Sequence, residues 1–222
     1  MIEVTYIDHM GSDLSVVNAA RVSFGKKSEA LGEVGIGDDP IIVPVLHDND
    51  VRLIRYLAKH NHKSPFNHAF ATFHVKAPIF VARQLVKHEY MPWNEISRRY
   101  VDDEPEFYVP AVWRGRSADK KQGSDGVVDV GDWGDTNWAC LTAYKDLLEQ
   151  GVAPEQARMV LPQSTMTEWY WSGSLFAFAK MCGLRLKDDT QYETRLVAQE
   201  IEDVMMDIYP NSWEALRMYD DE

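Results

Sequence analysis

The sequence has few cysteines and no long apolar run. Its two cysteines, Cys140 and Cys182, have a spacing that fits neither a metal-binding nor a redox motif. We therefore expect no disulfide framework and a reducing, cytoplasmic location. No apolar segment approaches the ~20 residues needed to span a bilayer, and the polar residues 1–11 are unlike a secretory signal. We expect neither a membrane partner nor export.

Positive charge is also scarce. The chain has 23 Lys and Arg against 35 Asp and Glu, which gives a net charge of −12. A general nucleic-acid binder needs a basic face to release counterions from phosphates, so we expect no nucleic-acid partner. A small phosphorylated ligand is still allowed, because a few Arg side chains and backbone donors can hold one phosphate within an acidic protein.

The apolar fraction, 45%, is enough for a buried core, and we expect a single domain over residues 1–222. Apolar alternation predicts strands at residues 2–7 and 68–76. Residues 163–171 are interpreted as a strand or the start of a helix, and residues 26–44 and 113–132 as surface loops. Helices are predicted at residues 13–22, 51–60, 79–88, 133–150, 154–160, 175–182 and 188–208. Helices outnumber strands without regular alternation, which indicates an α+β fold: a mixed or antiparallel sheet packed with several helices.

The densest polar cluster lies in residues 83–100. Its first half is predicted to be helical, which places Gln84 and His88 on one face. Its second half, residues 94–101, is predicted to be extended. Glu95, Ser97 and Arg99 then point to one side and could contact a phosphate and polar ligand groups. From residue types alone, a solvated, salt-bridged helix end followed by an edge strand is the favoured explanation of the segment.

A family resemblance favours the ligand-binding interpretation. Residues 87–99 resemble the signature of flavin-dependent thymidylate synthases, RHRxxSxNExSxR, with matches at His88, Asn94, Glu95, Ser97 and Arg99. Further family-like elements occur in order along the chain at residues 20–23, 62–68, 74–84, 106–110, 156–162 and 183–193.

The resemblance implies an enzyme that transfers a one-carbon unit from 5,10-methylenetetrahydrofolate to carbon 5 of dUMP, giving dTMP. It implies FAD and NADPH as cofactors, and a homotetramer whose active sites are shared between protomers. By matching position, the dUMP contacts are Gln84, Glu95, Ser97, Arg99, Arg158 and Arg185. Arg185 and Arg158 are the expected catalytic residues, with Arg185 stabilising negative charge on the uracil. Ser97 and Arg99 would hold the phosphate from a neighbouring protomer. The expected cofactor-binding residues are Ser23, Ser64, Lys87, His88, Glu89, Asn94, Ser174 and Lys180.

The departures from the family pattern gather on the flavin side. Lys87 replaces an Arg and lacks its planar guanidinium, and Glu89 replaces an Arg and so reverses the charge. Pro92 replaces a Ser and removes its hydroxyl and a backbone N–H donor. Ser174 and Lys180 stand where relatives have Asn. We therefore predict a rearranged flavin pocket in which Lys180 or Arg83 supplies the charge lost at Glu89.

Three alternatives remain open. A variant enzyme could hydroxymethylate dUMP or act on dCMP, because both reactions need the same contacts to the nucleotide phosphate. A non-catalytic flavin or nucleotide binder, or an interaction protein on the same fold, would lack turnover. No metal site is expected, because the spacing of the histidines at residues 60–74 does not suit one.

Overall fold

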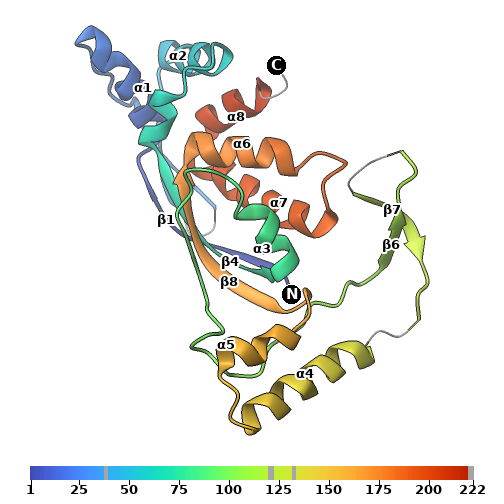
Figure 1. The fold of residues 1–222 in the computed structure, drawn as a ribbon. Coiled ribbons are helices and arrows are strands. Elements are labelled where there is room, and N and C mark those ends of the chain that lie inside the picture. Colours follow the sequence, from blue (N-terminus) through green and yellow to red (C-terminus); the bar gives the residue numbers. More distant parts are fainter. Residues whose placement is uncertain (38–39, 120–122, 132–133, 220–222) are drawn as a thin grey trace.

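A computed structural model describes residues 1–37, 40–119, 123–131 and 134–219 of the chain. Its centre is a four-stranded antiparallel sheet in the order β1-β4-β8-β5 (Figure 1). The strands are β1 (Glu3–Met10), β4 (Phe70–Pro78), β8 (Met166–Ser174) and β5 (Trp93–Glu95). The predicted α+β class with an antiparallel sheet is confirmed.

The sequence of β4 explains its position between β1 and β8. Buried Ala71, Phe73, Val75 and Ala77 alternate with less buried neighbours, as the period of two in a strand requires. On the other face, Thr72 and the β8 residue Ser172 form a cross-strand hydrogen bond of 2.9 Å between their hydroxyl oxygens. The buried row faces the helices.

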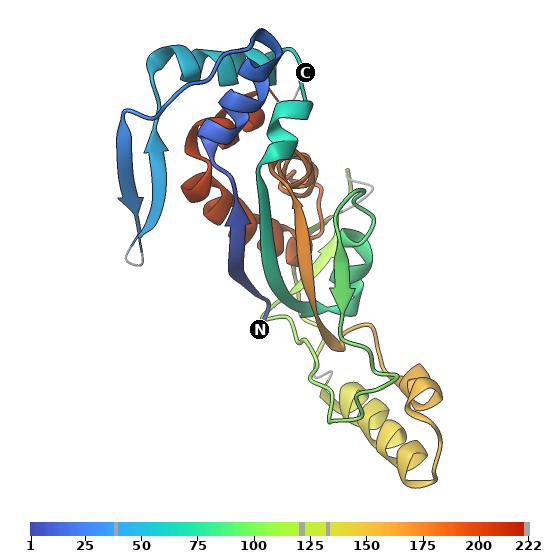
Figure 2. The same cartoon turned by 90° about the vertical axis from the view of Figure 1, so that its left-hand side faces the viewer.

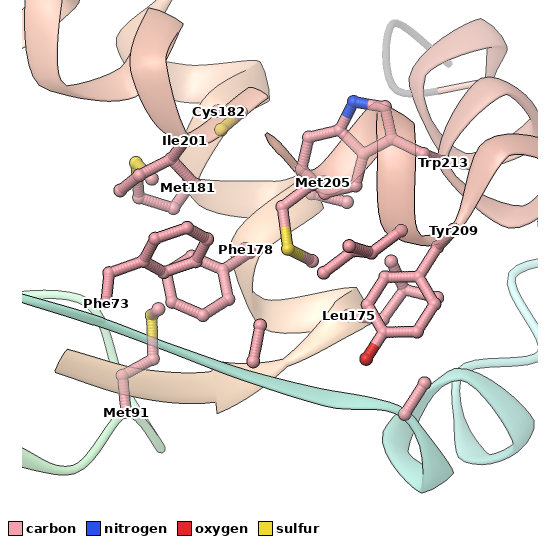
Figure 3. Packing of buried hydrophobic residues seen from close by; sticks show 14 of the residues in the cluster. Phe73, Met91, Leu175, Phe178, Met181, Cys182, Ile201, Met205, Tyr209 and Trp213 are labelled. Atoms are coloured by element: carbon pink, nitrogen blue, oxygen red, sulfur yellow. The ribbon is translucent and has the colours of Figure 1, made fainter. Parts of the chain in front are cut away.

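Helices α6 (Leu175–Arg185), α7 (Tyr192–Ile208) and α8 (Pro210–Met218) carry most of the core against the sheet. Phe178 of α6 packs edge-on against Phe73 of β4, with ring centroids 5.1 Å apart, and against Trp171 of β8 at 5.4 Å. Figure 3 shows this cluster, in which Met205 and Trp213 fill the space between the helices. The core thereby fixes the position of α6 against the sheet.

Two further helices, α1 (Asp13–Arg21) and α2 (Asp48–Lys59), lie beyond one end of the sheet (Figure 1). Buried Asp13 accepts hydrogen bonds from the backbone N–H groups of Asn211 and Ser212, at 2.8 and 2.9 Å. These donors are at the start of α8, where a carboxylate also complements the helix dipole. The contact ties the first helix to the last.

Three helices lie between β4 and β8 in the chain. The short α3 (Ile79–Leu85) follows β4 directly, and α4 (Gly134–Glu149) and α5 (Pro154–Ala157) form an arm at the other end of the molecule (Figure 2). The predicted start of the α4 helix, Trp133, lies outside the described residues. No helix in the described ranges is long and apolar enough to cross a membrane.

The prediction of two structureless surface loops is wrong. Residues 26–44 contain a hairpin of β2 (Gly32–Ile36) and β3 (Ile41–Val45), and residues 113–132 contain a hairpin of β6 (Trp113–Arg116) and β7 (Ser124–Val128). Both segments are rich in Gly and charged residues, which favours turns. The Val and Ile residues of β2, β3 and β7 nevertheless favour strands, and each strand pairs with its neighbour in the chain.

Two other predictions also need correction. The extended segment predicted over residues 94–101 ends at Glu95, because the backbone then turns and the Tyr100 N–H donates to the Ser97 carbonyl at 2.9 Å. Glu95, Ser97 and Arg99 therefore do not share one face of a strand. The sequence also predicts no helix after residue 208, whereas α8 follows immediately, with Pro210 in its first turn.

Candidate functional site

A cavity of about 590 Å³ opens beside the C-terminal end of α3; we call it the Gln84 cavity. Five parts of the chain meet there: α3, the end of α6, the segment entering α7, residues 108–112 and the β6–β7 hairpin. Its polar lining includes Gln84, Tyr108, Arg114, Arg185, Gln191 and Glu193. The structure thus brings together two of the predicted dUMP-binding residues, Gln84 and Arg185.

Gln84 is held by three contacts. Its side-chain amide donates to Gln191, and its amide oxygen accepts from the Thr194 hydroxyl at 3.2 Å. Its backbone carbonyl accepts from Arg185 Nη2, also at 3.2 Å. A glutamine fixed in this way presents a defined edge to the cavity, which suits recognition of a planar amide-bearing ring.

Glu193 forms the buried acidic side of the same cavity, with 3% of its surface exposed. It pairs with Arg114 of β6, and it accepts from Tyr108 Oη at 3.3 Å and from Gln191 Nε2 at 3.3 Å. Burial, and then the negative charge of Glu193, raise the pKa of Tyr108 to about 12. Tyr108 therefore remains a protonated donor at neutral pH, and the Arg114 pair anchors the hairpin over the cavity.

A second cavity, of about 560 Å³, lies beside the segment that follows α3; we call it the His88 cavity. It gathers five of the predicted cofactor-binding residues, namely Lys87, His88, Glu89, Ser174 and Lys180. Lys63, Phe70, Phe176 and Ala177 complete most of its wall. Of the two predicted sources of compensating charge, Lys180 lines this cavity, whereas Arg83 is exposed on α3 and is not part of the wall.

The two cavities meet at Arg185 and His88. Arg185 Nε donates to His88 Nε2 at 3.0 Å, which requires that this ring nitrogen be unprotonated. Burial, followed by the charges of Arg185 and Lys180, lowers the pKa of His88 to about 4. Burial also lowers the pKa of Arg185 from its usual value. The contact is therefore between a guanidinium cation and a neutral imidazole.

Four predicted dUMP-binding residues lie apart from both cavities. Glu95 on β5 accepts from Thr167 Oγ1 at 2.7 Å, and exposed Arg99 donates from Nε to Ser97 Oγ at 3.1 Å. Arg158 is exposed in the 3₁₀ helix Arg158–Val160 and donates to the Glu155 carbonyl at 3.2 Å. Within one chain, the predicted substrate-binding set is therefore divided between the Gln84 cavity and residues outside it.

The remaining predicted cofactor residues are also dispersed. Ser23 and Ser64 line a third cavity, of about 740 Å³, beside α1 and α2, together with Arg21 and His62. Asn94 is exposed on β5. Described residues form no group of three or more His, Cys, Asp or Glu side chains suited to a metal ion.

Sequence reasoning gave no role to Tyr108, Arg114, Glu193 or Lys63, although each lines one of the cavities. Arg114 is one of several basic residues in a Gly-rich segment, and its ion pair with Glu193 joins residues 79 positions apart. No local pattern signals such a pair. Tyr108 and Glu193 lie within or beside family-like elements, which was the available signal.

Comparison with known proteins gives the structural class first. The fold is similar to the crystal structure of the UMP/dUMP methylase PolB from Streptomyces cacaoi bound with 5-Br dUMP. The TM-score is 0.79 at 31% sequence identity, over 99% of this chain and 96% of that one. The chain thus has an α+β fold that a nucleotide methylase also has.

Sequence comparison then gives the family. The model of the family described as thymidylate synthase complementing protein matches residues 5–211. A flavin-dependent thymidylate synthase of Thermus thermophilus is 38% identical over 216 residues, covering 96% of this chain and 74% of that protein. The enzyme of the same name from Kosmotoga olearia is 38% identical over 219 residues, covering 96% and 88%. The chain belongs to the flavin-dependent thymidylate synthase family.

Proposed function

We propose that the protein methylates carbon 5 of dUMP to give dTMP, with 5,10-methylenetetrahydrofolate as the one-carbon donor, FAD as the flavin and NADPH as the reductant. The observation that carries this function is the contact between Arg185 and His88. It joins a cavity suited to a pyrimidine to one suited to a flavin, so that two planar rings can lie against each other.

The residues of the His88 cavity fit a flavin. Phe70, Phe176 and Ala177 supply apolar surface for a ring system, and Lys63, Lys87 and Lys180 supply positive charge for phosphate. His88 is neutral at physiological pH and adds no further charge at the ring. A bound flavin would supply the hydride chemistry, while the protein supplies orientation and charge.

In the Gln84 cavity, Gln84 and Arg185 would act on the pyrimidine. The fixed Gln84 amide would orient the uracil edge through complementary hydrogen bonds. Arg185 would stabilise the negative charge that grows on a uracil carbonyl oxygen as carbon 5 becomes nucleophilic. Since its Nε is bonded to His88 and one Nη2 bond goes to Gln84, its guanidinium is oriented before substrate arrives.

The separation of the predicted dUMP contacts supports a site shared between protomers. We propose a homotetramer in which Glu95, Ser97, Arg99 and Arg158 of one chain complete the Gln84 cavity of another. Arg99 and Ser97 are already bonded to each other on the exposed turn after β5, which presents a guanidinium and a hydroxyl side by side for a phosphate. We further propose one domain over residues 1–222 and a cytoplasmic location, in which Cys140 and Cys182 are not joined in a disulfide.

The test is a spectrum followed by turnover. Purified protein should carry or bind FAD, and dUMP should perturb the flavin absorption band because the two ligands lie in adjoining cavities. With methylenetetrahydrofolate and NADPH, the nucleotide product should have the mass of dTMP. A hydroxymethylated product would identify the variant enzyme instead, and absence of flavin binding would contradict the function. UMP should be assayed beside dUMP, because PolB, the structurally similar protein, is described as acting on both.

A further inference from the structure

The His88 cavity is part of a longer cationic groove. A neighbouring cavity of about 510 Å³ shares Lys63, Phe176 and Lys180 with it. The two cavities therefore adjoin across these three side chains. We call the combined feature the lysine groove; its charged lining consists of Lys59, Lys63, Lys87, Lys180 and Glu89. Four lysines against one carboxylate is an unusual balance in a chain of net charge −12.

These lysines have no carboxylate partner among the described residues. The ion pairs of the described chain involve other cations, such as Arg21, Lys76 and Lys145, and none includes a lysine of the groove. Lys63 instead lies over the Phe176 ring, with Nζ 5.5 Å from the ring centroid. Like charges gathered without counterions repel one another, so their placement favours an anionic ligand with more than one charge.

We propose that Lys63 and Lys180 clamp the diphosphate of a flavin adenine dinucleotide at the junction of the two cavities. This inference rests on the proposed function. The isoalloxazine half lies on the His88 side, and the adenosine half lies in the cavity lined by Lys59, His60 and Tyr219. Lys63 and Lys180 thereby supply positive charge in place of the family arginine at whose position this chain has Glu89.

Size and helix geometry support this arrangement. Each cavity is in the range of a small-molecule site, and a dinucleotide has two nucleotide-sized halves joined by its diphosphate. The shared residues are the ones at which such a ligand must cross from one cavity to the other. The groove also faces Phe176 and Ala177 in the first turn of α6, where the positive end of the helix dipole adds to the field of the lysines.

The experiment compares flavins that differ in phosphate content. The full-length wild type and the variants Lys63→Ala and Lys180→Ala are titrated with FAD, FMN and riboflavin, and binding is followed by flavin fluorescence. Each substitution should weaken FAD roughly tenfold, as expected for loss of one charged contact, and leave riboflavin affinity unchanged. ADP should displace FAD from the wild type and should lose this effect in the double variant.

Matched controls isolate charge from folding. Lys187→Ala removes one positive charge just beyond α6, outside the groove, and should leave FAD affinity unchanged. Lys180→Arg should restore most of the affinity, and Glu89→Gln should strengthen FAD binding several-fold by removing the one carboxylate of the groove. Thermal unfolding of each variant monitors the folded state.

The outcomes separate the two proposals. If the double variant binds FAD as tightly as the wild type, or loses riboflavin to the same degree as FAD, the diphosphate clamp is wrong while the proposed function still stands on the wild-type result. If the wild type itself binds no flavin, the proposed function fails and the clamp fails with it.

Discussion

Arg185 Nε and His88 Nε2 lie 3.0 Å apart and form a hydrogen bond in which the guanidinium donates. The two residues come from α6 and from the segment after α3, and each lines a different cavity. The bond requires His88 Nε2 to be unprotonated, and it fixes the orientation of the Arg185 guanidinium. A residue proposed to act on the pyrimidine is thereby coupled to a residue of the flavin side.

The first prediction concerns the pKa of His88. Arg185→Met removes the nearer of the two charges that lower this pKa, so the value should rise from about 4. It should stay below the ordinary 6.5, because burial is the larger cause and remains. The histidine ring signals, titrated by NMR in the wild type and the variant, measure the change. An unchanged value would show that Arg185 and His88 do not interact in solution.

The second prediction is the pH dependence of stability that follows from the same shift. The folded pKa of His88 is about 4 and its ordinary value is 6.5, so between these values the unfolded chain binds a proton that the folded chain does not. The free energy of unfolding should therefore decrease as the pH falls from 6.5 to 4, and His88 should contribute no slope above 6.5. Urea unfolding at several pH values measures this slope, and His88→Gln should make it shallower. An identical slope in the variant would assign the effect to other groups.

The third prediction separates catalysis from binding at Arg185. Arg185→Ala should lower kcat by about 10²–10³, as removal of a preorganised charge-stabilising donor does in other enzymes. Arg185→Lys keeps the charge but replaces the planar guanidinium, whose Nε and Nη2 reach His88 and Gln84 separately, with a single nitrogen, so it should recover only part of the rate. Steady-state assays with dUMP measure both, and Arg52→Ala on the exposed side of α2 is the control. A full rate in Arg185→Ala would remove this residue from the chemistry.

The elements that could be predicted from the sequence are those with a strong local pattern. The alternation in β4 and the helical periodicity of α2 and α7 arise from one buried face each, so the sequence predicts them directly. The segment after Glu95 does not behave in this way. Its alternating polar residues are compatible with a strand, but the last backbone hydrogen bond to β8 is from the Ile96 N–H to the Glu168 carbonyl, and the chain then turns so that the Tyr100 N–H donates to the Ser97 carbonyl.

The same distinction between local patterns and tertiary packing applies to the candidate site. Gln84 lies in α3, but His88 lies beyond its end at Leu85 and lines the other cavity, so the shared helical face predicted from their spacing of four does not form. Arg185 reaches them through hydrogen bonds that span 97 and 101 positions of the chain, which only the packing of the helices establishes. Lys63 joins the flavin side in the same way, from the start of the 3₁₀ segment before β4.

The fourth prediction tests the buried carboxylate beneath the β6–β7 hairpin. Glu193→Gln leaves Arg114 without its partner and should destabilise the fold by about 3 kcal/mol, as expected when one member of a buried ion pair is removed. The pKa of Tyr108 should fall from about 12, because Glu193 raises it and Arg114 lowers it. Chemical unfolding and ultraviolet titration of the phenol measure the two effects. Faster proteolysis within the hairpin should accompany them, and a hairpin as resistant as in the wild type would show that Arg114 is not its anchor.

The fifth prediction tests whether an active site takes residues from two chains. Arg99→Ala and Arg185→Ala should each be nearly inactive as pure proteins, since each removes a proposed dUMP contact. When the two are mixed under conditions that exchange subunits, about a quarter of the sites should receive Arg185 from one variant and Arg99 from the other, and activity should reappear accordingly. The matched control mixes Gln84→Ala with Arg185→Ala. These residues line one cavity of one chain and are joined by a hydrogen bond, so no hybrid can contain both, and activity should not return. If the first mixture stays as inactive as its parents, Arg99 and Arg185 do not complete each other's site, and the exposed turn after β5 needs another explanation.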